Sequence, residues 1–256
     1  MIVKFVSRIT LAIALATGAT AAWAETIKVG VTGGPHAAIL EQVATLAAKD
    51  GLQIKVVEFD DYQLPNAALV QGDLDANSFQ HQPFLDNQIK DRGYSITAIA
   101  KTVVFPIGLY SKRVKALSDL KEGDKVAIPN DPSNGGRVLL LLQSQGLITL
   151  RADAGIKATV LDVVDNPRKL RFVELPAAQL PRSLDDVTVA AINSNYAIEI
   201  GLLPHRDALV LESPDSPYAN VIAVRTQDKD KPVFAKLVRL YQSPEIRRFI
   251  QEKYGS

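Results

Sequence analysis

The sequence of 256 residues contains no cysteine. This absence excludes disulfide frameworks, thiolate metal sites, cysteine nucleophiles and a lipid attached through a cysteine thiol. An excess of charge of one sign is missing too, because 29 Lys and Arg nearly balance 28 Asp and Glu, for a formal net charge of +1. A protein that binds nucleic acid by releasing counterions usually carries a basic excess. We therefore expect no nucleic-acid partner.

A long apolar run occurs only near the N-terminus. Lys4 and Arg8 precede the apolar stretch 9–16, and Ala22-Trp23-Ala24 follows it as a site of the kind that signal peptidase cuts. The stretch is short for the roughly 30 Å of hydrocarbon that a membrane anchor must cross. We predict that residues 1–24 are a cleavable signal peptide and that the chain from Glu25 is exported; the alternative is membrane association through an uncleaved N-terminal segment.

Motifs of the common enzyme classes are also missing. The sequence has no G-x-S-x-G elbow, no phosphate-binding G-x-x-x-x-G-K-[ST] loop and no G-x-G-x-x-G fingerprint. His36, His81 and His205 lack a partner histidine at metal-ligand spacing. The pairs Asp60-Asp61 and Asp185-Asp186 are adjacent, so their side chains point apart and favour helix caps or turns over acid/base couples. We predict a protein that is not an enzyme and that has no cofactor and no metal.

What is present is the composition of an ordinary globular domain, with 47% hydrophobic and 22% charged residues. Apolar residues alternate over 27–31, recur with helical spacing over 39–47, and alternate again over 52–59, which predicts a βαβ unit with parallel strands. The same patterns predict further strands at 96–104, 125–128, 159–164 and 187–192, and helices ending near 69, opening at 83, and covering 137–145 and 233–249.

This strand and helix alternation occurs twice, and no low-complexity linker separates the two series. We therefore predict two α/β lobes in close contact. Residues 25–106 plus 223–256 would form lobe 1, because the last helix returns to it, and residues 107–222 would form lobe 2. A cleft between two such lobes is the expected binding site.

The segment 129–137 has the composition of an anion-binding turn. It joins the end of a predicted strand to the start of a helix, where free N–H groups and the helix dipole favour negative charge. Arg137, placed on the first helical turn, can hold a carboxylate through two parallel charge-assisted hydrogen bonds. The alternative is a plain turn in which Arg137 pairs with a surface acid.

The segment 75–84 combines amides, one imidazole and two aromatic rings around a proline. Phe79, Phe84 and Tyr62 would give the apolar walls of a pocket for an apolar side chain that contains a polar or sulfur atom. The alternative is that the two Phe are core residues and that His81 is a buried, satisfied histidine. Asn193 and Asn220 follow predicted strands and can equally be turn residues.

Several longer stretches, in order along nearly all of the chain after residue 24, resemble the NlpA family of methionine-binding lipoproteins, the substrate-binding components of methionine ABC importers. The matching stretches are Phe59-Asp60-Asp61-Tyr62, Gly72-Asp73-Leu74-Asp75-Ala76-Asn77, Phe79-Gln80-His81, Asp91-Arg92-Gly93-Tyr94, Pro129-Asn130-Asp131-Pro132, Leu161-Asp162-Val163-Val164 and Gln179-Leu180-Pro181-Arg182-Ser183-Leu184-Asp185-Asp186.

The resemblance implies a bilobed periplasmic-binding-protein fold (type II-like) with the ligand cleft between two α/β lobes. By the same resemblance, Arg137 would hold the carboxylate of an amino acid, and Asn193 and Asn220 would bind its amino and carboxylate groups. The residues that would surround the side chain are Tyr62, Phe79, His81 and Phe84. Phe84 stands where the family pattern has tyrosine, which bears on the identity of the ligand.

The expected function is capture of methionine, L or D, by lobe closure and its delivery to an ABC permease and ATPase of the inner membrane. Since family members are usually anchored through a cysteine, the missing cysteine predicts a freely diffusing, monomeric periplasmic form without a lipobox. The alternatives within the same class are another small apolar amino acid or a methionine-containing dipeptide. An enzyme or a surface adhesin is less favoured.

Overall fold

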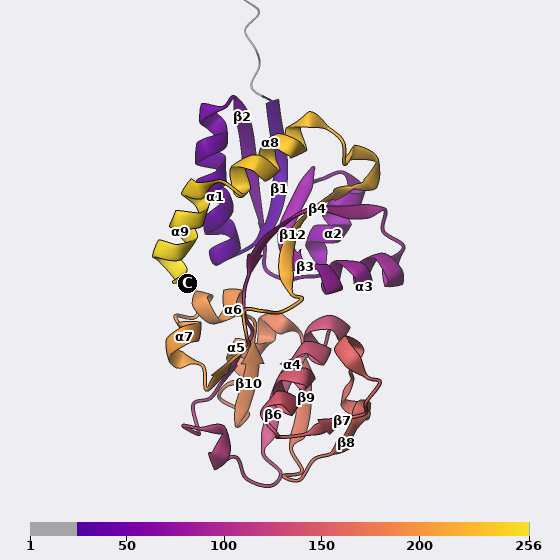
Figure 1. The fold of residues 1–256 in the computed structure, drawn as a ribbon, viewed down its shortest axis with the longest axis vertical. Helices are drawn as coiled ribbons and strands as arrows, with labels where there is room; N and C mark the ends of the chain where they lie inside the picture. Colours follow the sequence, from indigo (N-terminus) through magenta and orange to yellow (C-terminus); the bar gives the residue numbers. More distant parts are fainter. Residues whose placement is uncertain (1–24, 256) are drawn as a thin grey trace, which may run out of the picture.

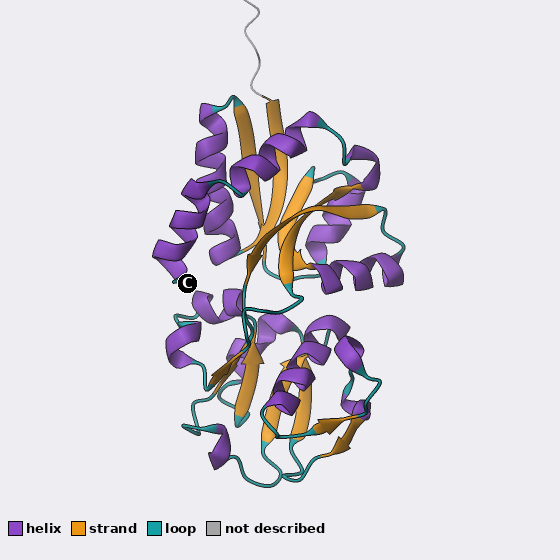
Figure 2. Cartoon of the chain, viewed as in Figure 1, coloured by secondary structure: helices purple, strands orange, loops and turns teal. Residues whose placement is uncertain are grey.

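The computed structural model describes residues 25–255, so the predicted signal peptide lies outside the described residues. The described chain forms two α/β lobes, one above the other in Figure 1, and each is built around a five-stranded sheet. Helices flank the strands of both lobes (Figure 2). Within residues 25–255, no helix has both the length and the apolar composition needed to cross a membrane.

The sheet of the first lobe has the strand order β2-β1-β3-β12-β4. Strand β1 (Glu25–Thr32) runs parallel to β2 (Leu52–Phe59) and to β3 (Ala76–His81). Strand β12 (Ala219–Arg225) lies antiparallel between β3 and β4 (Ile96–Val104). The helices of this lobe are α1 (Pro35–Lys49), α2 (Leu64–Gln71), α3 (Gln82–Arg92), α8 (Pro232–Tyr241) and α9 (Pro244–Tyr254).

The sheet of the second lobe has the order β11-β5-β10-β6-β9. Strand β6 (Lys125–Pro129) runs parallel to β9 (Arg171–Leu175) and β10 (Val189–Ile192). Strand β5 (Gly108–Tyr110) is antiparallel to β10 and to β11 (Val210–Leu211). The remaining elements are the pair β7 (Thr149–Leu150) and β8 (Val163–Asp165), and the helices α4 (Pro132–Ser144), α5 (Leu180–Ser183), α6 (Ser194–Glu199) and α7 (Pro204–Asp207).

The chain passes between the lobes twice, between β4 and β5 and again between β11 and β12. The predicted boundary at 106 falls in the first crossing. The predicted boundary at 222 falls inside β12, where Ala219 is already paired with Val104 of the first sheet, so the second crossing lies before Ala219. An apolar run shows that a strand is buried but not which sheet it joins, and this explains the displaced boundary.

Some elements differ from the sequence-based expectation for identifiable reasons. The predicted helix over 233–249 is two helices, because Pro244 starts α9 and proline has no N–H with which to continue α8. The predicted strand over 159–164 is mostly a 3₁₀ turn, Val160–Asp162, in which the Asp162 carboxylate accepts from the backbone N–H of Thr159 at 2.8 Å. Both changes come from local capping chemistry that competes with apolar periodicity.

Helix α4 begins at Pro132, five residues before Arg137, so the glycines of this segment are helical. The Asp131 carboxylate caps the helix by accepting from the backbone N–H of Asn134 at 2.9 Å. A Cβ placed on Gly136 would lie 2.6 Å from the carbonyl oxygen of Ile156. Gly136 is therefore needed for close packing against the 3₁₀ turn Gly155–Lys157, and not for approach of a ligand to a loop.

Gly136→Ala should destabilise the protein by about 1–3 kcal/mol, because the added methyl overpacks a backbone contact. In an open helix the same change would stabilise it by roughly 0.5–1 kcal/mol, so the sign is diagnostic. Urea unfolding followed by circular dichroism measures the difference, with Gln145→Ala at the exposed end of the same helix as control. Equal or greater stability of Gly136→Ala would contradict the packing role.

Candidate functional site

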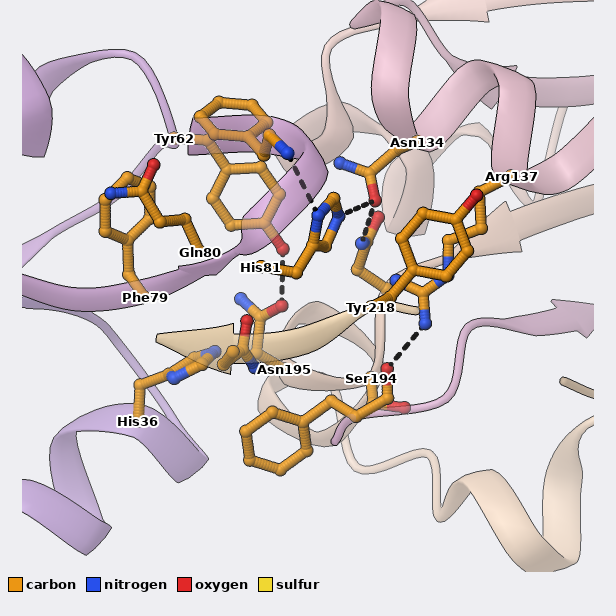
Figure 3. Close-up of a pocket in the computed structure, with 14 residues that line it drawn as sticks. His36, Tyr62, Phe79, Gln80, His81, Asn134, Arg137, Ser194, Asn195 and Tyr218 are labelled. Atoms are coloured by element: carbon orange, nitrogen blue, oxygen red, sulfur yellow. Dashed lines mark hydrogen bonds between the residues drawn. The ribbon is translucent and has the colours of Figure 1, made fainter. Parts of the chain in front are cut away.

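A narrow cavity with a free volume of about 20 Å³ lies between the two lobes, at the place where a two-lobed protein is expected to bind its ligand. Both lobes contribute to it, as does the end of the second crossing at Tyr218 (Figure 3). The lining residues are His36, Tyr62, Phe79, Gln80, His81, Phe84, Phe105, Asn134, Arg137, Asn193, Ser194, Asn195, Tyr218 and Asn220.

The structure brings all seven sequence-predicted site residues to the wall of this cavity. These are Arg137, Asn193, Asn220, Tyr62, Phe79, His81 and Phe84. Sequence reasoning did not assign a site role to the other lining residues, among them Asn134, Asn195 and Tyr218. Asn134 lies in the anion-binding segment, and Asn195 and Tyr218 each lie two positions from a predicted site residue, Asn193 and Asn220. Position in the sequence was therefore the signal that could have identified all three.

One side of the cavity is an aromatic cluster from the first lobe. The Phe79 and Phe84 rings lie 6.0 Å apart at 78°, and the Tyr62 ring lies 6.1 Å and 6.0 Å from them. Such edge-on arrangements fix the rings relative to one another. We call the part of the cavity that these rings line the aromatic slot. It suits an unbranched apolar or thioether side chain, because sulfur packs favourably against ring edges.

His81 connects this wall to the second lobe. Its Nδ1 accepts a hydrogen bond from the backbone N–H of Phe84 at 3.2 Å, so the proton of the neutral ring is on Nε2. That Nε2–H donates to Asn134 Oδ1 at 3.1 Å (Figure 3). Burial lowers the pKa of His81 to about 3, with the Arg137 charge acting in the same direction. The ring is therefore an uncharged structural donor at neutral pH.

Asn134 is the centre of a hydrogen-bond network in the second lobe. Its Nδ2 donates to both Asp131 carboxylate oxygens, at 3.1 and 3.0 Å, which fixes which end of the amide is the oxygen. Its Oδ1 accepts from Asn193 Nδ2 at 3.1 Å as well as from His81. The network leaves the Asn193 Oδ1 atom buried and without a partner among the described residues.

Arg137 is 2% exposed and already forms a two-bonded ion pair with Glu212. Its Nε donates to Glu212 Oε1 at 2.9 Å, and its Nη2 donates to Glu212 Oε2 and, at 2.9 Å, to the carbonyl oxygen of Phe105. The guanidinium carbon also lies 4.4 Å from the centre of the Tyr218 ring. Hydrogen bonds within residues 25–255 therefore use two of the three guanidinium nitrogens.

This geometry corrects the expectation that Arg137 offers two parallel hydrogen bonds to a ligand. The edge that forms such a pair, Nε with Nη2, is occupied by Glu212. Within the described part of the chain, Nη1 takes part in no hydrogen bond, so a ligand carboxylate would meet that nitrogen alone. The alternative, in which Arg137 pairs with a surface acid, holds for the pairing with an acid but not for its exposure, because Glu212 is only 12% exposed at its side chain.

Hydrogen bonds join the lobes beside the cavity. Tyr62 OH donates to Asn195 Oδ1 at 2.6 Å, and Tyr196 OH donates to the Asp60 carbonyl oxygen at 3.2 Å. Both donors have raised pKa values, mainly because they are buried. With the His81 contact to Asn134, these bonds link residues of the two lobes directly.

Polar atoms that remain unpaired within the described residues include both donors and acceptors. Asn195 Nδ2 is a buried donor, Asn193 Oδ1 is a buried acceptor, and the Tyr218 hydroxyl can be either. Arg137 Nη1 adds charged N–H donors. Beside the aromatic slot, this set suits a molecule with an apolar tail and, at one end, both an ammonium and a carboxylate group. No group of three or more His, Asp or Glu in residues 25–255 is placed to hold a metal ion.

Comparison with known proteins gives consistent matches. The model of the NlpA lipoprotein family matches residues 27–256. The D-methionine-binding lipoprotein MetQ of Escherichia coli K12 is 52% identical over 224 residues, which cover 86% of this chain and 82% of MetQ. A nutrient-binding protein of Burkholderia cenocepacia, solved bound to methionine, is 56% identical with a TM-score of 0.87 and covers 89% of this chain and 96% of its own.

A periplasmic substrate-binding protein of an ABC transporter from Coxiella burnetii gives a similar result. It is 50% identical, has a TM-score of 0.87, and the match covers 90% of this chain and 97% of that one. These solved structures confirm the predicted α/β fold with two lobes.

The same comparisons contradict the predicted location. Relatives are named as lipoproteins, and the family that matches residues 27–256 is a lipoprotein family. The prediction of a freely diffusing periplasmic protein is therefore contradicted by the names of its relatives. That prediction relied on the absence of cysteine from the sequence, in which this chain departs from the lipoprotein pattern.

His36→Gln should flatten the dependence of stability on pH. Burial lowers the pKa of His36 in the folded protein to about 4. In the unfolded chain the imidazole has a pKa near 6.5, so between these values it is protonated in the unfolded chain and neutral in the folded protein. The resulting stability is present above about pH 6.5 and is lost as the pH falls toward about 4. Between pH 7 and 5 the wild type should lose about 2 kcal/mol more than the variant.

Urea unfolding at several pH values measures that difference. His205→Gln, which removes the exposed third histidine, is the control for loss of an imidazole. An unchanged slope in His36→Gln would contradict the buried, neutral state of this ring.

Proposed function

Because this chain belongs to the NlpA lipoprotein family, we propose that it captures methionine between its two lobes as the substrate-binding protein of an ABC importer. The single observation that carries the proposal is the combination of an aromatic slot with unpaired polar atoms of both kinds in one interlobe cavity. Relatives named for methionine binding, and one solved with methionine bound, support it. The protein acts by binding and carries out no reaction.

In the proposed complex the thioether side chain lies against the wall formed by Phe79, Phe84 and Tyr62. Burying such a side chain contributes about 1.5–3 kcal/mol, while a micromolar binder needs about 8 kcal/mol, so the amino-acid end contributes most of the affinity. The carboxylate would accept from Arg137 Nη1, and the ammonium would donate to the amide oxygen of Asn193. Asn220 lies beside this end at the start of β12, paired with His81.

Closure of the lobes is the proposed mechanism. A ligand stabilises the closed form only by the difference between its affinities for the closed and open forms. Here the aromatic slot belongs to the first lobe and Arg137, Asn193 and Asn195 to the second, so both ends of the ligand are held only when the lobes meet. The closed surface would then be recognised by a permease and its ATPase in the inner membrane, with the protein acting as a monomer.

The wild-type protein should be stabilised by methionine in a thermal-shift panel, by about 2.7 kcal/mol at 100 times the dissociation constant. The panel includes both methionine enantiomers, leucine, norleucine, alanine and a glycyl-methionine dipeptide. Native mass spectrometry of freshly purified protein identifies any ligand that it retains. A larger shift with leucine or the dipeptide would reassign the ligand within the class, and no shift with any compound would refute a binding function.

Tyr62→Phe should weaken methionine binding by between about twofold and tenfold, the range expected for one hydrogen bond of about 0.5–1.5 kcal/mol. The lost hydroxyl donates to Asn195 across the lobes, so the closed form alone loses the bond. Tyr110→Phe is the matched control, since the buried Tyr110 hydroxyl has no partner within the described residues. Isothermal titration calorimetry compares them, and equal affinities would contradict a role of this bond in closure.

A further inference from the structure

The charge of the cavity wall is determined by very few groups. Among the described residues that line it, Arg137 carries a charged side chain, and His36 and His81 are held neutral by burial. The other lining residues are amides, hydroxyls and aromatic rings. An isolated guanidinium would therefore give the closed cavity a net charge of +1, in surroundings where charges interact more strongly than in water.

Glu212 compensates this charge from outside the cavity. Its side chain is not among those that line the cavity, and it pairs with the Nε and Nη2 edge of Arg137. The residue is itself fixed at the boundary of the lobes. Its backbone N–H donates to the Ile107 carbonyl oxygen at 2.9 Å, and its Oε2 accepts from the Ile107 N–H at 3.4 Å. Glu212 thus ties both crossing segments to Arg137.

The other acids near the cavity are engaged elsewhere. Asp131 caps α4 and lies behind Asn134, accepting three hydrogen bonds from that residue. Glu199 lies beside Gly33 and Gly34, where a Cβ on Gly33 would come within 3.1 Å of its Oε1. Neither makes a hydrogen bond or salt bridge to Arg137 within the described part of the chain. Glu212 is therefore the acid whose charge is coupled directly to the guanidinium.

We propose that Glu212 makes the interlobe cavity electrically neutral and thereby selects zwitterionic ligands over ligands with a net negative charge. The proposal rests on the proposed function, because it concerns the ligand of that same cavity. Glu212 acts through Arg137, so it is a specificity-determining positioning residue that does not touch the ligand. With Glu212 in place, Arg137 contributes directional N–H donors at Nη1 without an excess of positive charge.

Neutrality explains why the cavity pairs one cationic donor with an uncharged acceptor. A zwitterion brings no net charge, so its carboxylate can bind Arg137 Nη1 and its ammonium can bind Asn193 Oδ1 without leaving an unbalanced charge buried. A carboxylate without the ammonium would give the closed cavity a net negative charge. It would also leave the Asn193 oxygen unpaired, and both effects disfavour it.

Glu212→Gln tests the proposal, since it removes the charge and keeps the shape. Calorimetry measures the dissociation constants of methionine, of its des-amino analogue methylthiobutanoate, which is an anion, and of methionine methyl ester. The pH is set below the pKa of the ester's amine, so that the ester is a cation. The ratio of the methionine constant to the methylthiobutanoate constant should rise at least about tenfold relative to wild type. Binding of the ester should weaken more than that of methionine.

Two controls separate charge from geometry. Glu212→Asp keeps the charge and shortens the side chain, so it should weaken all three ligands by a similar factor and leave the ratios as in wild type. Asp215→Asn removes an exposed acid three residues away and should change neither affinities nor ratios. If Glu212→Gln weakens the three ligands equally, or has no effect, the charge role is refuted while the methionine affinity of the wild type still stands.

A second variant, Arg137→Gln, should change the relative affinity for cationic and anionic ligands in the opposite direction. It tests the proposal if Glu212→Gln does not fold. Arg137→Gln leaves Glu212 uncompensated, so all ligands should bind less tightly but the ester should gain relative to methylthiobutanoate. Circular dichroism verifies the fold of each variant. A shift in the same direction as Glu212→Gln would refute the proposal, and a wild type that binds none of the three would refute the proposed function with it.

Discussion

The buried ion pair between Arg137 and Glu212 is the interaction on which the rest of the site depends. Two charges removed from water cost several kcal/mol each, and such a pair is tolerated only where geometry is good and the remaining donors are satisfied. Here the pair is two-bonded, the Phe105 carbonyl takes another N–H, and the Tyr218 ring covers the guanidinium face. Arg137 comes from α4, Phe105 from the first crossing and Glu212 from the second. Each crossing segment is thus bonded to the same guanidinium, so the position of the charge and the relative position of the lobes are set together.

The neutral His81 ring has a comparable role on the other side of the cavity. Its Nδ1 accepts a hydrogen bond from the backbone N–H of Phe84 at the start of α3, so the ring proton is on Nε2 and is donated to Asn134. This bond orients the Asn134 amide, whose oxygen also accepts from Asn193. A protonated ring would have to break the bond from Phe84, and burial prevents that. The first lobe therefore places a fixed donor, His81 Nε2–H, opposite a fixed acceptor of the second lobe, Asn134 Oδ1. Complementarity of this kind allows the lobes to meet in one register without a large apolar interface.

The sequence predicted a large part of this arrangement, and the gaps have physical causes. Strand alternation and helical spacing located β1, α1, β2, β4 and β6 well, since those elements bury regular apolar faces. The helix expected over 233–249 and the strand expected over 159–164 were altered by Pro244 and Asp162, whose local hydrogen-bonding chemistry overrides periodicity. All seven expected site residues reached one cavity. The partner of Arg137 was not predicted, because Glu212 is 75 residues away and no spacing rule links an acid in a crossing segment to a helix. Asn195 was missed for the same reason, as its partner Tyr62 lies in the other lobe.

The buried polar atoms at the cavity affect the equilibrium between the open and the closed arrangement of the lobes. Asn193 Oδ1, Asn195 Nδ2 and the Tyr218 hydroxyl are each buried without a partner among residues 25–255, and such an atom costs about 1–3 kcal/mol. Opening the lobes would expose these atoms to water and remove that cost, while it would break the Tyr62 and His81 contacts, each worth about 0.5–1.5 kcal/mol. The first sum, about 3–9 kcal/mol, exceeds the second, about 1–3 kcal/mol, so by these contributions the lobes without ligand favour opening. A ligand that pairs with these atoms removes the cost in the closed form only. Part of its binding free energy then stabilises the closed form over the open form. The same unpaired atoms that disfavour closure without ligand determine which ligands can induce it.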